Sequence, residues 1–139
     1  MIAVGPAYPR PVLHHLVLWV PDLDQAESSW RWLLGELGYE LDRSFDGRLV
    51  FRHPGGFAVA LESSTDMVPG MLYSRLRPGL NNLAFRVDSA SALTAILDAA
   101  DEHGWSPLAS DRHPIAPGAQ VAYLEDHDGF EVELVAPAP

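Results

Sequence analysis

The sequence contains no cysteine, and its 9 lysine and arginine residues are far outnumbered by 19 aspartate and glutamate residues. The lack of cysteine excludes disulfides, thiolate metal sites and cysteine nucleophiles, and it fits a reducing environment. The net charge of −10 argues against nucleic acid or an anionic membrane surface as a partner, because phosphate groups are bound by basic patches. No apolar run approaches the roughly 18 residues of a membrane helix, and the chain start lacks the pattern of a secretion signal. We therefore expect a cytoplasmic protein that binds neither nucleic acids nor membranes.

The first part of the chain predicts a strand, a helix and three further strands. An apolar, β-branched stretch that stops at Pro21 is typical of a strand. Asp22, followed by Gln25 in the spacing of a capping box, begins a helix that Gly38 ends. The three short strands are expected at residues 39–45, 48–52 and 57–62.

The same order recurs after a segment with serine, proline and glycine but little periodicity. Asp88 is expected to cap the second helix and Gly104 to end it, among strands at residues 82–87, 105–110, 119–124 and 130–136. The repeat predicts an α+β fold of two tandem βαβββ modules, which form a curved eight-stranded mixed sheet around a cleft with the helices outside. The chain is then one domain, residues 1–139, with module one at 12–63, a linker at 64–80 and module two at 81–137.

Side chains of a strand alternate between the two faces of a sheet, so each strand divides into two sets. One set is uniformly apolar, as Leu16, Leu18 and Val20 are in the first strand, and it is expected to pack on a helix. His14 is assigned to this helix side. The other set mixes polar and apolar side chains, as a ligand site on a concave sheet does. Its polar and aromatic members are His15, Trp19, Glu62, Asn82, Arg86, Glu131 and Glu133.

Three segments resemble the vicinal oxygen chelate superfamily, which includes glyoxalase I, extradiol dioxygenases, and fosfomycin and bleomycin resistance proteins. They are HLVLWVPDL at 15–23, GLNNLAFRV at 79–87 and EDHDGFEVEL at 125–134. The resemblance extends from about residue 12 to residue 136 and agrees with the two-module fold. It implies a small-molecule ligand and a homodimer, in which the modules pair within one chain or across the dimer. It does not fix the reaction, because this fold hosts several chemistries.

The resemblance also implies a divalent metal site with ligands from the first and fourth strands of each module. His15 and Glu133 match two of these positions. Asn82 stands where the family usually has histidine, and Ala60 stands at the remaining position, so Glu62 on the same strand face is the substitute ligand. An imidazole and carboxylates suit an ion such as Zn, Ni, Mn or Fe. The alternative for His15 is a hydrogen-bonded strand histidine without a metal.

The sequence is compatible with two functions. A metal-dependent lyase, isomerase or dioxygenase would use Glu133 and Glu131 as its catalytic carboxylates. A metal-free protein of the bleomycin-resistance type would instead hold an aromatic or drug-like ligand against Trp19. The residues predicted to bind substrate are Trp19, Arg86, Asn82 and Tyr123. Pairing with a glutamate is the alternative for Arg86, and a solvated position at the rim is the alternative for Glu131.

Overall fold

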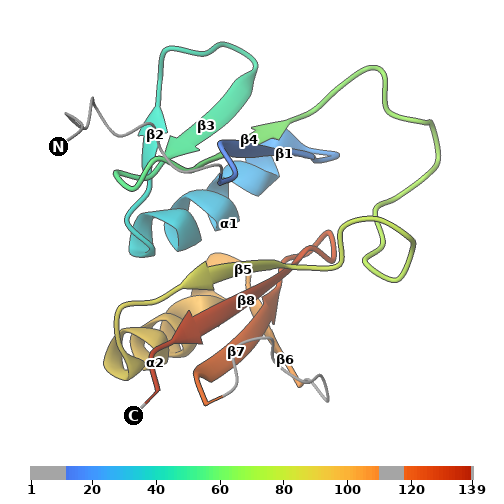
Figure 1. Ribbon diagram of the computed structural model, residues 1–139. Coiled ribbons are helices and arrows are strands. Elements are labelled where there is room, and N and C mark those ends of the chain that lie inside the picture. Colours follow the sequence, from blue (N-terminus) through green and yellow to red (C-terminus); the bar gives the residue numbers. More distant parts are fainter. Residues whose placement is uncertain (1–11, 110–117, 139) are drawn as a thin grey trace, which may run out of the picture.

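The computed structural model describes residues 12–109 and 118–138, and its first half is a four-stranded mixed sheet with one helix (Figure 1). The elements are β1 (His15–Trp19), α1 (Leu23–Glu36), β2 (Glu40–Asp42), β3 (Arg48–Arg52) and β4 (Ala58–Glu62). The strands lie in the order β1-β4-β3-β2, with β1 parallel to β4 and the other neighbours antiparallel. We call this sheet A.

The second half repeats this arrangement as sheet B. Its elements are β5 (Leu83–Arg86), α2 (Ala90–Ala99), the short 3-10 helix η1 (Ala100–His103), β6 (Ser106–Leu108), β7 (Gln120–Glu125) and β8 (Glu131–Ala136). The order is β5-β8-β7-β6, again with one parallel pair, β5 and β8. The predicted α+β class and the βαβββ repeat are therefore confirmed. The strands form two separate four-stranded sheets, and in the described part of the chain no hydrogen-bonded ladder joins them into the one sheet that was expected.

The helix ends follow local capping chemistry. Asp22 caps α1 as predicted, because its Oδ1 accepts a hydrogen bond from the backbone N–H of Gln25 at 3.1 Å. The second helix is capped one residue later than predicted. Ser89 rather than Asp88 takes this position, and its Oγ accepts from the N–H of Ala92 at 3.1 Å.

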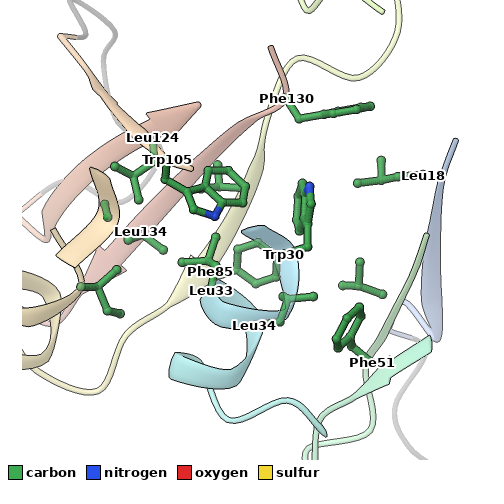
Figure 2. Packing of buried hydrophobic residues seen from close by; sticks show 14 of the residues in the cluster. Leu18, Trp30, Leu33, Leu34, Phe51, Phe85, Trp105, Leu124, Phe130 and Leu134 are labelled. Atoms are coloured by element: carbon green, nitrogen blue, oxygen red, sulfur yellow. The ribbon is translucent and has the colours of Figure 1, made fainter. Parts of the chain in front are cut away.

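One hydrophobic core joins the two modules, and the buried face of α1 forms part of it. The predicted arrangement had the helices outside, whereas α1 lies between sheet A and sheet B (Figure 1). The side chain of Trp30 on α1 is fully buried between residues of the two sheets (Figure 2). Its ring meets that of Trp105 edge-on with centroids 5.0 Å apart, and the indole N–H of Trp105 donates to the Ser29 carbonyl at 2.9 Å.

This packing determines where the mixed faces of the sheets point. The apolar stripes of both sheets line the same core, with Leu18 and Val59 from sheet A and Phe85 and Leu134 from sheet B among its members. Side chains of opposite parity on each strand therefore point away from α1, on different sides of the chain. Among residues 12–109 and 118–138, no helix is long and apolar enough to cross a membrane.

Candidate functional site

The mixed face of sheet A is open to solvent. On β1 the predicted alternation is confirmed, since Leu18 is buried in the core while Val17 and Trp19 are 41% and 46% exposed. Across the sheet, His15 is paired with Ala58, and Val17 is paired with Ala60. The small side chains on β4 leave space above the middle of the sheet.

That space is a hollow of about 180 Å³. The described residues that line it all belong to the first module: His14, His15, Val17, Phe45, Arg48, Val50, Arg52, Ala58 and Ala60. Val50, Ala58 and Ala60 form a small buried apolar cluster separate from the main core. The hollow thus combines an apolar floor with cationic, imidazole and aromatic walls, which is the composition of a small-molecule site.

The two adjacent histidines form one wall of the hollow. The Nδ1 atoms of His14 and His15 lie 2.9 Å apart, so one imidazole donates to the other. The assignment of His14 to the helix side was wrong, because His14 lines the hollow. It precedes β1, and strand alternation does not extend to a residue outside the strand.

Glu62 is held by two side chains on the same face. Its Oε2 accepts the indole N–H of Trp19 at 3.2 Å, and its Oε1 lies 3.1 Å from Nη2 of Arg48. Both carboxylate oxygens are therefore engaged. This arrangement fixes the orientation of the Trp19 ring at the rim of the sheet, and a metal ion would have to displace these contacts to use Glu62.

The remaining candidate residues lie on the other sheet. The ladder places Glu133 between Ala84 on β5 and Tyr123 on β7, and Glu131 opposite Glu125. Glu131 and Glu133 are both buried. Asn82 precedes β5, and its amide donates to Oδ1 of Asn81 at 3.0 Å.

Among the described residues, the linker residue Arg75 contacts the carboxylates of this face, whereas Arg86 does not. Arg75 Nη1 contacts Glu125 Oε2 at 2.8 Å and donates to the Gly129 carbonyl at 3.2 Å, and its Nε lies 3.8 Å from Oε1 of Glu131. Arg86 makes no ion pair within the described residues. The sequence offered no signal for Arg75, because the linker has no periodicity that would reveal which way it folds.

The predicted metal ligands do not assemble in one chain. His15 and Glu62 lie on sheet A, whereas Glu133 lies on sheet B, with Asn82 just before its strand β5, and the mixed face of sheet B points elsewhere. Catalytic metal sites usually have three protein ligands around one ion. Since Glu62 is held by Trp19 and Arg48, the described part of one chain offers two imidazoles, those of His14 and His15, at the hollow of sheet A.

A second group of possible ligands lies at the turn before β8. Asp126, His127 and Asp128 each offer an atom within 4.8 Å of the others. Both carboxylate oxygens of Asp126 already accept hydrogen bonds that stabilise the fold. Its Oδ1 accepts from the N–H groups of Asp128 and Phe130, and its Oδ2 accepts the indole N–H of Trp30 at 3.0 Å. Burial raises the pKa of Asp126, and the hydrogen bonds from Trp30 and Phe130 oppose this rise.

The family is decided by comparison with known proteins. Residues 14–123 match the model of the glyoxalase/bleomycin resistance protein/dioxygenase superfamily. The chain belongs to this superfamily. A curated relative, the uncharacterized protein YqjT of Bacillus subtilis, is 32% identical over 128 residues, which cover 91% of this chain and 99% of that protein.

Solved structures of the glyoxalase superfamily have the same fold. A protein of Bacillus halodurans named as a glyoxalase is 34% identical, with a TM-score of 0.79 over 92% of this chain and 97% of its own. A glyoxalase/bleomycin resistance protein of Albidiferax ferrireducens is 20% identical, with a TM-score of 0.66 over 90% and 98% of the two chains. The second likeness shows the fold alone.

Proposed function

We propose that this member of the glyoxalase superfamily binds a small organic molecule in the hollow of sheet A without a metal ion, as the bleomycin-resistance members do. The observation that carries the proposal is the combination of an apolar floor, Val50 with Ala58 and Ala60, and polar walls around an open space. A flat ligand would gain burial on the floor and orientation from the walls. The hydrogen bond to Glu62 holds the Trp19 ring in place, and this ring offers such a ligand an aromatic surface at the rim of the sheet.

Metal-dependent catalysis is less well supported by the donor set. An exposed histidine pair remains on sheet A once Glu62 is assigned to Trp19 and Arg48, and imidazoles without a carboxylate fall short of a full catalytic set. On sheet B, Asn82 offers a neutral amide in place of an imidazole. We therefore place small-molecule binding ahead of lyase, isomerase or dioxygenase chemistry.

We also propose that a second copy of the chain covers the mixed face of sheet A with its own sheet B. Val17 and Phe45, which line the hollow, and Trp19, two residues along β1 on the same face, are all exposed apolar side chains, and such side chains are normally covered when they gather on one face. In the superfamily, ligand positions from both modules share one cleft. In this chain the two mixed faces point apart, so two copies are required to bring first-module and second-module positions such as His15 and Asn82 together.

The binding proposal is tested by filling the hollow. Ala60→Phe puts a ring on its floor, and the exposed Ala95 on α2 provides the matched control Ala95→Phe. Single-ring aromatic fragments, half of them carboxylates and half neutral, are titrated into ¹⁵N-labelled protein while amide resonances are followed. We expect fragments that shift the amides of Val17, Val50 and Ala60 in the wild type and in Ala95→Phe to lose this effect in Ala60→Phe. Fragments that bind all three proteins equally well would refute the site.

A further inference from the structure

The charged side chains around the hollow of sheet A are basic, which is unusual in such an acidic chain. The chain carries 19 acidic residues and a net charge of −10, yet no carboxylate of residues 12–109 and 118–138 lines this hollow. Three other hollows in the described part of the chain each include acidic residues, for example Glu125 and Asp126 in one and Glu40 and Asp42 in another. The absence of carboxylates here coincides with two arginines and two histidines in the wall.

Each arginine is positioned by one carboxylate outside the lining and keeps further donors free. Arg52 contacts Oδ2 of Asp42 through Nε at 2.8 Å, and the hydrogen bonds from Arg52 and Ser44 lower the pKa of Asp42 to about 2, so this anchor stays charged. Arg48 contacts Glu62 through Nη2. A guanidinium has five N–H donors, and within the described residues the other N–H groups of Arg48 and Arg52 have no partner.

The two guanidinium groups also share an aromatic neighbour. The central carbons of Arg48 and Arg52 each lie 5.9 Å from the centroid of the Phe45 ring. Both arginines are on the same face of β3, four residues apart, and the Phe45 ring lies within cation–π distance of each. This arrangement restrains two planar cationic groups beside an apolar floor, which reduces the entropy lost when an anion is bound.

We propose that the hollow binds a small organic anion, with a flat apolar body against Val17, Val50 and Ala60 and its anionic group on the free N–H donors of Arg48 and Arg52. This inference rests on the proposed function and adds the ligand class to it. Arginine suits the role because its planar N–H groups match the two oxygens of a carboxylate or phosphate. The hollow is smaller than the roughly 300–1,000 Å³ of sites for drug-sized ligands, so a ligand of about one ring is expected.

The test compares benzoate with benzamide, which has nearly the same shape and no charge. Both are titrated into the wild type and into Arg48→Gln, Arg52→Gln and Arg43→Gln, with amide shifts at Val17, Val50 and Ala60 as the readout. Arg43 is the matched control, because it is an exposed arginine just before Phe45 in sequence, loses the same charge and does not line the hollow. Resonance dispersion of each variant reports whether it is folded.

We expect benzoate to bind the wild type at least about tenfold more tightly than benzamide, which corresponds to one hydrogen bond to a charged group. This preference should fall in Arg48→Gln and Arg52→Gln and persist in Arg43→Gln. Equal binding of the two probes at the hollow, unchanged in the arginine variants, would overturn the anion inference and leave the small-molecule site standing. If neither probe shifts these amides while other neutral fragments do, the inference is likewise wrong and the site stands. If no fragment of any kind shifts them, both proposals are wrong.

Discussion

The buried hydrogen bond between Trp30 and Asp126 should be a main source of stability, because it joins α1 to the second module. Trp30→Phe keeps an aromatic ring but removes the N–H that Asp126 Oδ2 accepts at 3.0 Å. Loss of a hydrogen bond to a buried charged group costs about 1.5–3 kcal/mol, and the smaller ring leaves a cavity that adds about 1 kcal/mol. We expect the free energy of unfolding to fall by about 3 kcal/mol, which lowers the urea midpoint by about 1–3 M.

The matched control is Trp32→Phe, the same substitution two residues along α1. Trp32 is half-buried and stacks on His103 with ring centroids 4.4 Å apart, and within the described residues its indole N–H has no hydrogen-bond partner. Its replacement should lower the free energy of unfolding by less than about 1 kcal/mol. Urea titrations of the wild type and both variants, followed by far-UV circular dichroism, measure the difference. Equal losses in the two variants would refute the role of the hydrogen bond.

The cost of Trp30→Phe should also depend on pH. Burial raises the pKa of Asp126 in the folded state, so the folded state binds this proton more readily than the unfolded state, and the stability contributed by Asp126 decreases as the pH rises from about 4 through the raised pKa. Without the Trp30 donor the folded-state pKa should rise further. The difference in stability between the wild type and Trp30→Phe is therefore expected to be smaller at pH 4.5 than at pH 7. A difference that stays constant or widens toward acid would contradict this reasoning.

Three further predictions follow from the same structure. Light scattering should give twice the 15.2 kDa chain mass for the wild type and for the linker control Leu76→Glu, but one chain mass for Val17→Glu on the mixed face of sheet A; a monomeric wild type would exclude the dimer. Asn82→His adds an imidazole to sheet B, and calorimetry should show Zn²⁺ affinity at least about tenfold above that of the wild type only while the dimer is intact, so the gain should vanish when Val17→Glu is added. Gly104→Ala should destabilise the fold by about 1–2 kcal/mol in urea titrations because Gly104 has a φ of +83°, whereas Gly35→Ala inside α1 should stabilise it by up to about 1 kcal/mol; effects of the same sign would contradict the conformational argument.

Features that depend on neighbouring residues could be predicted from the amino-acid pattern. Strand alternation identified Val17 and Trp19 as facing away from the core, and the spacing from Asp22 to Gln25 located the start of α1. The repeat of element order predicted the two-module fold, and the resemblance of three segments to a known superfamily indicated the family. These signals are short-range, because side-chain periodicity and helix capping are fixed by the backbone within a few residues.

Tertiary structure alone decided how the two modules face each other and therefore what each site residue contacts. Trp30 would be buried in any packing of α1, and only its contacts with Trp105 and Asp126 show that α1 lies between the sheets and turns their mixed faces apart. In the same way, the sequence predicts the carboxylate of Glu62 as a metal ligand, but in the fold this carboxylate contacts Trp19 and Arg48. Hydrophobic burial has no preferred direction, so an apolar pattern specifies that a face is covered without specifying which distant segment covers it.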